Sequence, residues 1–215
     1  PQSVHPYYWR WFWDYGSGGL GDFGCHYMDL AHWALDLSCP TSIVATGPTP
    51  NAETTSSGLT VKYEYPARGE RPPVELTWYD GGKKPPALAV YRDEEGRPLD
   101  WGSGQLFVGE RGAVLSDYGR HRLLPVERAG DFQVPEPSIP ASIGHHQEWI
   151  EAIKTGGATT CNFSYSGALT EAVLLGVVAY RSGEAIEWDA ENLRARHSRR
   201  AQQMIHKEYR AGWTL

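Results

Sequence analysis

Two carboxylates and one imidazole lie at helical spacing in the segment "GGLGDFGCHYMDLAHWALDL", residues 18–37. Asp22 and His26 are four positions apart, and Asp29 follows His26 by three. Side chains at these spacings lie on one side of a helix, so the three groups would form a single polar strip. An imidazole, with an ordinary pKa of about 6.5, takes up a proton near neutral pH, and a neighbouring carboxylate orients it or binds hydroxyl groups. The spacing therefore predicts proton transfer to or from a hydroxyl-bearing ligand.

The same residues also have a purely structural interpretation. Aspartate is a preferred helix N-cap, and Gly21 before Asp22 fits that role. On this interpretation His26 is a core histidine with satisfied hydrogen bonds, and Asp29 is a surface or structural carboxylate. The glycines before Asp22 would in either case let other groups, including a ligand, approach the backbone closely. Both interpretations stay open from these residues alone.

Aromatic side chains are abundant, with nine Trp and twelve Tyr in the chain. Trp13 and Tyr15 come just before the glycine-rich turn. Aromatic rings of this kind stack on sugars or fill a core. We expect both side chains to contact a substrate, with packing between the first helix and the sheet as the competing use.

A second histidine pair opens the segment "HHQEWIEAIKTG". We expect His145 and His146 to lie at the start of a helix, with Glu148 close behind. Imidazole and carboxylate groups also bind divalent metals such as zinc or manganese. A metal site that joins this cluster to Asp22 and His26 is therefore a further hypothesis.

The elements that must position these groups follow from hydrophobic periodicity. The apolar positions predict a helix from about Leu20 to Leu37, stopped by Cys39-Pro40. Short runs of alternating apolar and polar residues then predict strands, and each run ends at Gly, Pro or Asp-Gly. These runs are "TSIVATG", "GLTVKYEYP", "PVELTWYDG" and the three strands within "GQLFVGERGAVLSDYGRHRLLPV".

The C-terminal half predicts mostly helices. "HHQEWIEAIKTG" has an apolar face and ends at a natural C-cap, Gly156. "SYSGALTEAVLLGVVAYRSG" predicts a longer, buried helix ending at Gly183, and "AIEWD" and residues 198–208 predict a strand and a last helix. Strands in a block flanked by helices predict an α+β fold with an open, largely antiparallel β-sheet and helices packed on one face.

Composition narrows the class of protein. The chain has 215 residues and a net charge of −6 without a basic stripe, so we expect no nucleic-acid partner. The run Arg194–Arg200 is interpreted as a solvated helix face. The three cysteines form no CxxC pair, so no disulfide framework is expected. No run of eighteen apolar residues is present, so we expect no membrane-spanning helix and no membrane partner.

We expect one α/β substrate-binding domain over residues 1–215, in which residues 1–17 form an aromatic, linker-like lead-in. The chain starts without a methionine or an apolar leader and contains no G-x-G-x-x-G loop. We therefore expect no nucleotide-binding domain within it, a preceding part of the protein that is missing here, and a cytoplasmic location.

The segment "GSGGLGDFGCHYMDLAHWALDLSCP" resembles the C-terminal half of the Gfo/Idh/MocA oxidoreductase family. "LTWYDGGKKPP", "FVGERGAVLSDYG", "HHQEWIEAIKTG" and "NFSYSGALTEAVLLGVVAYRSG" agree with it in the same order. Family members carry an N-terminal Rossmann domain for NAD(P), followed by a domain that binds substrate and usually mediates oligomerisation. Asp22 and His26 match the D-x-x-x-H motif of that second domain. The glycine fingerprint and catalytic lysine of the first domain have no counterpart here, so the resemblance implies that this chain alone binds no cofactor.

The resemblance implies a sugar- or polyol-acting domain of an NAD(P)-dependent oxidoreductase, with Asp22 and His26 as its catalytic groups. It also places the segment of His145 and His146 near the substrate pocket, so both are expected to contact the sugar. A stand-alone glycosidase, assisted by a metal or by NAD, is the first alternative. A non-catalytic module for carbohydrate binding or oligomerisation is the second. We also expect a homo-oligomer through the exposed face of the open sheet.

Overall fold

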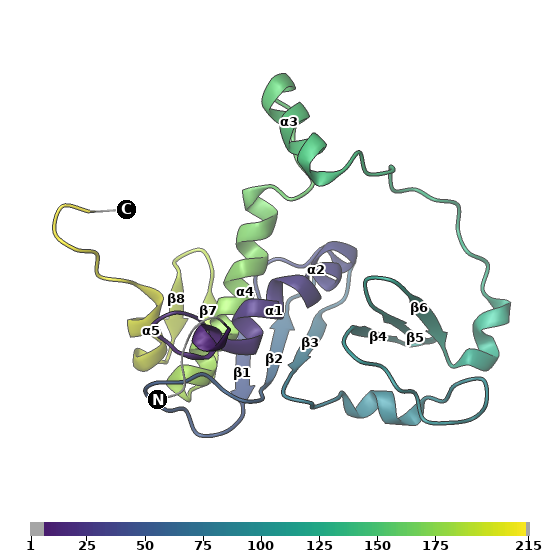
Figure 1. Ribbon diagram of the computed structural model, residues 1–215, viewed down its shortest axis with the longest axis horizontal. Helices are drawn as coiled ribbons and strands as arrows, with labels where there is room; N and C mark the ends of the chain where they lie inside the picture. Colours follow the sequence, from purple (N-terminus) through teal and green to yellow (C-terminus); the bar gives the residue numbers. More distant parts are fainter. Residues whose placement is uncertain (1–6, 214–215) are drawn as a thin grey trace. The chain divides into compact units, whose positions relative to one another are not determined.

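The computed structural model describes residues 7–213, and it has the predicted α+β fold with antiparallel sheets (Figure 1). The chain divides into two compact units. Unit 1 comprises Pro1–Pro85 and Ala168–Leu215, and unit 2 comprises Pro86–Gly167. The single domain over residues 1–215 stays a prediction.

Unit 1 is built on a five-stranded sheet in the order β3-β2-β1-β7-β8, in which all neighbouring strands are antiparallel. Alternation in β2 decides its two faces, because Val61, Tyr63 and Tyr65 are buried whereas Lys62 and Glu64 lie on the other face. The strands are β1 (Ser42–Thr46), β2 (Thr60–Tyr65), β3 (Val74–Tyr79), β7 (Ile186–Asp189) and β8 (Arg194–Arg196).

Helices α1 (Gly18–Tyr27), α2 (Asp29–Leu35) and α4 (Phe163–Ser182) pack on the buried face of this sheet (Figure 1). Gly24 of α1 brings that helix against Val173 of α4, where a Cβ would come within 2.7 Å of the valine side chain. Gly176 of α4 faces the hydroxyl of Tyr63, which a Cβ would meet at 2.0 Å. Two helical glycines therefore let the helices and the sheet approach closely.

The other face of the sheet carries charged side chains on β2 and β3. The Lys62 ammonium lies 3.4 Å from the Glu64 carboxylate and 2.8 Å from that of Glu75. Val44 of β1 adds an apolar side chain that is 43% exposed. Self-association through this face stays a prediction.

The helix expected from Leu20 to Leu37 begins earlier, at Gly18, and ends earlier, at Leu35, and it is divided at Met28 into α1 and α2. The prediction that Cys39-Pro40 ends it is wrong, because Asp36 adopts a left-handed conformation with φ 53° and ψ 50°. The Leu37 amide then donates to the His32 carbonyl at 2.9 Å, which turns the chain out of the helix.

The interpretation of Arg194–Arg200 as one helix face is also wrong. Its first three residues form β8, in which Ala195 is buried and the flanking arginines are exposed. His197 then takes a positive φ of 62°, and α5 (Arg199–Ile205) begins after the N-cap Ser198. The Ser198 hydroxyl accepts from the Ala201 amide at 3.0 Å and donates to the Glu184 carboxylate.

Helix α4 has the length and apolar composition of a membrane span, with a mean hydropathy of 1.3 over 18 residues. Its residues Leu169, Val173 and Val177 are nevertheless buried in unit 1. Glu171 accepts a hydrogen bond from the Trp188 indole at 2.7 Å. We therefore interpret α4 as a core helix that lies against the sheet.

Unit 2 contains the second sheet, a three-stranded antiparallel meander. Its strands are β4 (Gln105–Gly109), β5 (Gly112–Ser116) and β6 (His121–Leu124), as the sequence predicts. A small core that includes Leu88, Trp101 and Leu115 lies against this sheet. Helix α3 (His145–Thr155) ends at Gly156 in a left-handed conformation, which confirms the predicted C-cap.

Candidate functional site

The glycine-rich start of α1 is packed against protein. Gly18, with a φ of +74°, lies against Thr55, and a Cβ there would come within 2.6 Å of the Thr55 hydroxyl. A Cβ on Gly19 would lie 3.0 Å from the carboxylate of Asp80. The Asp80 carboxylate also accepts from the Leu59 amide and, at 2.9 Å, from the Trp78 indole. These two glycines therefore serve packing rather than ligand approach.

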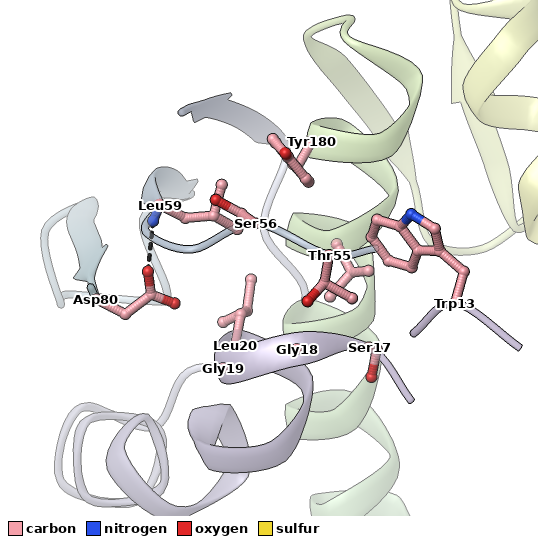
Figure 2. A pocket seen from close by; sticks show the side chains of 11 residues that line it. Trp13, Ser17, Gly18, Gly19, Leu20, Thr55, Ser56, Leu59, Asp80 and Tyr180 are labelled. Carbon is pink, nitrogen blue, oxygen red and sulfur yellow. Dashed lines mark hydrogen bonds between the residues drawn. The ribbon is translucent and has the colours of Figure 1, made fainter. Parts of the chain in front are cut away.

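Figure 2 shows a cavity beside this helix start, lined by Thr55, Asp80, Tyr180 and Trp13 among others. Its volume of about 10 Å³ is close to that of one water molecule and far too small for a sugar ring. The indole of Trp13 donates to the Asn51 carbonyl at 3.0 Å, and its ring centroid lies 6.4 Å from that of Tyr180. The structure thus places Trp13 in packing contacts of unit 1.

A larger, open pocket of about 230 Å³ is lined by the same glycine turn and by the segment before it. Its charged lining residues are Arg10 and Asp22, and its aromatic ones are Trp9 and Tyr15. Gly16 and Gly21 also line this pocket. A Cβ on Gly16 would come within 2.6 Å of the Arg10 carbonyl oxygen, and one on Gly21 within 1.9 Å of the Ser17 hydroxyl, so these glycines also allow close packing. The sequence-predicted residues Tyr15 and Asp22 are therefore brought together in one pocket.

Two of the lining residues of this pocket form an ion pair. The Arg10 Nε donates to Asp22 Oδ2 at 3.0 Å, and its Nη1 donates to the Tyr7 carbonyl at 3.1 Å. The guanidinium carbon lies 4.6 Å from the ring centroid of Tyr7 and 4.9 Å from that of Trp9, within the range of cation–π attraction. The Arg10 and Asp22 side chains are 27% and 34% exposed, so solvent and a ligand can reach both.

Asp22 does not cap α1. The N-cap residue is Ser17, and Asp22 lies in the second turn of the helix. His26 follows one turn later on the same helix and is exposed, with its ring centroid 6.0 Å from that of Phe23. The interpretation of these residues as a cap and a core histidine is therefore wrong, and both reach solvent.

The core histidine of this segment is instead His32, which is 1% exposed. Its Nε2 lies 2.9 Å from the Tyr65 hydroxyl, with the rings edge to face. Burial lowers the pKa of His32 from 6.5 to about 4, although the nearby Asp29 carboxylate opposes this shift. Asp29 itself is the first residue of α2 and half-buried.

His145 and His146 open α3 and are exposed, with ring centroids 4.0 Å apart. Glu148 is engaged within unit 2, because its Oε1 accepts from the Thr160 hydroxyl at 2.9 Å and from the Thr160 amide. These bonds hold the pKa of Glu148 below its usual range. No group of three His, Cys, Asp or Glu side chains that could hold a metal occurs among the described residues.

Sequence reasoning missed Arg10 and Trp9. The available signal was the single cation inside the aromatic run "YYWRWFW", since arginine commonly stacks on aromatic faces. Its partner Asp22 lies twelve positions away, so local spacing did not connect the two.

Comparison with protein families finds a match in the N-terminal part of the chain. Residues 1–94 match the model described as the GFO/IDH/MocA C-terminal domain. The matched range contains α1, α2, β1–β3 and the whole lining of the larger pocket. A comparison with curated proteins returned no match.

Proposed function

We propose that this chain, whose residues 1–94 match the Gfo/Idh/MocA C-terminal domain, is the substrate-binding part of an oxidoreductase for sugars or polyols. The observation that carries the proposal is the pocket of about 230 Å³ at Asp22, the acidic residue of the family motif. Hydroxyl groups need both donors and acceptors, and aromatic rings cover the apolar face of a sugar. The Arg10–Asp22 pair and the rings of Trp9 and Tyr15 supply these groups.

In this proposal Asp22 accepts a hydrogen bond from one hydroxyl of the substrate and fixes the orientation of the ring. His26 lies one turn further along α1, beyond the residues that line the pocket, and it accepts the proton of the hydroxyl that is to become a carbonyl. An exposed imidazole suits this role, because it exchanges its proton with solvent after each turnover.

The described residues do not fit a dinucleotide. The glycine-rich start of α1 is occupied by Thr55 and by the carboxylate of Asp80, which would repel a pyrophosphate at that helix end. The nicotinamide cofactor implied by the family would therefore be bound outside the described residues. The part of this chain in the reaction is to bind the substrate and to receive its proton.

Sugar binding by the purified chain tests the proposal. The probes are methyl glucoside, methyl galactoside and myo-inositol, followed by tryptophan fluorescence and by NMR of the histidine rings. Saturable binding is expected, and the His26 ring signals are expected to shift when the ligand is added. Asp22→Asn should weaken binding about tenfold, because a hydrogen bond to a charged group contributes about 1.5 kcal/mol or more.

Asp100→Asn and His121→Gln are matched controls, because both side chains are exposed and lie in unit 2. Neither control should change the affinity. The proposal is refuted if the wild-type chain binds none of the probes, or if Asp22→Asn binds them as tightly as the wild type. Binding that leaves the His26 signals unmoved would favour a non-catalytic binding module.

A further inference from the structure

We infer that Arg10 is the specificity-determining residue of this pocket, and that its pairing with Asp22 selects one uncharged sugar ring over sugar acids and sugar phosphates. The inference rests on the proposed function, because it concerns the substrate class of the same pocket. It adds a residue to the site that lies outside the D-x-x-x-H motif.

Arg10 is held in place from several sides. Its Nε is bonded to Asp22, its Nη1 is bonded to the Tyr7 carbonyl, and its guanidinium lies near the rings of Tyr7 and Trp9. A guanidinium fixed in this way loses little further conformational entropy when a ligand binds. The same contacts fix the Asp22 carboxylate at the pocket wall, so Arg10 also positions Asp22.

The charges of the pocket cancel. Arg10 and Asp22 are its only charged lining residues among those the structure describes, and they neutralise each other at 3.0 Å. An anionic ligand that accepts from the remaining N–H groups of Arg10 would share one guanidinium with the Asp22 carboxylate, which would place two negative groups side by side. A neutral ligand avoids this repulsion and leaves the ion pair intact.

The pair matches neighbouring hydroxyls of one sugar. Asp22 accepts from a hydroxyl and Arg10 donates to the next one, so adjacent hydroxyls meet an acceptor and a donor at adjacent positions. The 62%-exposed ring of Tyr15 and the 40%-exposed ring of Trp9 provide apolar faces. The volume of about 230 Å³ is below the roughly 300 Å³ at which pockets for drug-sized ligands begin. It therefore suits a single ring.

The test compares methyl glucoside, glucuronate and glucose 6-phosphate as ligands of the full chain at constant ionic strength. The wild type is expected to bind methyl glucoside at least tenfold more tightly than either anion. Asp22→Asn removes the negative charge that neutralises Arg10. It should therefore reduce or reverse the preference for methyl glucoside over the two anions. Arg10→Met should weaken methyl glucoside binding about tenfold. Arg181→Met is the matched control, because Arg181 lies over the Trp13 ring and outside this pocket.

Circular dichroism of each variant checks that the fold is retained, and Arg10→Lys provides a second, milder replacement that keeps the charge but loses the planar fork. If the wild type binds none of the three ligands, the proposed function itself is refuted. The inference about Arg10 alone is overturned in two cases. One is that the wild type binds the anions as tightly as methyl glucoside, and the other is that Asp22→Asn leaves the preference unchanged.

Discussion

Acidification from about pH 7.5 to about pH 5 should destabilise the protein through His32, the imidazole buried between α2 and β2. Its pKa is lowered to about 4 in the folded chain, mainly by burial, and is about 6.5 in the unfolded chain. Below about pH 6.5 the unfolded chain therefore binds a proton at His32 that the folded chain does not bind. The stability contribution is complete above about pH 6.5 and is lost progressively as the pH falls to about 4.

The magnitude follows from the width of this window. Each pH unit within it corresponds to about 1.4 kcal/mol. The interval from about pH 6.5 to about pH 5 therefore lowers the free energy of unfolding by about 2 kcal/mol, and the whole window lowers it by about 3 kcal/mol. His32 is 1% exposed, so solvent screening reduces this value little.

Urea unfolding at about pH 7.5 and about pH 5, followed by tryptophan fluorescence, measures the effect. His32→Gln keeps an amide that can reach the Tyr65 hydroxyl but has no titrating group. Its loss of stability between the two pH values should be smaller than that of the wild type by about 2 kcal/mol. His121→Gln, at an exposed position, should behave as the wild type does.

NMR titration of the histidine C2 protons should also show one ring that stays neutral down to about pH 4. An equal loss of stability in the wild type and in His32→Gln would refute the reasoning. Titration of every histidine ring near its ordinary pKa would refute it as well.

Two further predictions concern packing and capping in unit 1, and urea unfolding measures both. Gly176→Ala should destabilise the fold by about 1–3 kcal/mol, because its methyl group would meet the buried Tyr63 hydroxyl. Adding Tyr63→Phe should restore part of the lost stability, and no recovery in the double variant would contradict this account. Ser198→Ala should lower the free energy of unfolding by about 1–2 kcal/mol, because the hydroxyl caps α5 at the Ala201 amide and also binds Glu184. An unchanged free energy of unfolding would show that neither hydrogen bond stabilises the fold.

Most of the fold could be predicted from the alternation of apolar and polar residues in strands and from the residues that end helices. The runs that became β1, β2 and β3 alternate in the sequence, and one face of each is more deeply buried in the sheet. Gly156 and Gly183 mark the ends of α3 and α4, because a positive φ is easily adopted only without a Cβ. The short strand β8 escaped prediction because three residues with two arginines carry too little pattern, although it pairs with β7 in a local hairpin.

The candidate site was predicted in part. Asp22 and His26 were placed on one helix because their spacing is local, and both reach solvent as that hypothesis requires. Arg10 was missed because it meets Asp22 only after the turn at Gly16 folds the aromatic segment back, with the Gly16 amide bonded to the Phe12 carbonyl. No periodic pattern in the sequence indicates that the aromatic segment folds back toward α1.

The sequence by itself determined the α+β class, the order of the predicted elements and the helix that carries Asp22 and His26. These properties depend on contacts between residues that are near each other in the chain. Only the tertiary structure decided which histidine is buried and which cation faces Asp22. His26 and His32 lie six residues apart in the sequence, yet His26 is exposed whereas His32 is buried and contacts Tyr65 of β2. Burial and ion pairing depend on distances across the fold, and the spacing of residues along the chain does not contain them.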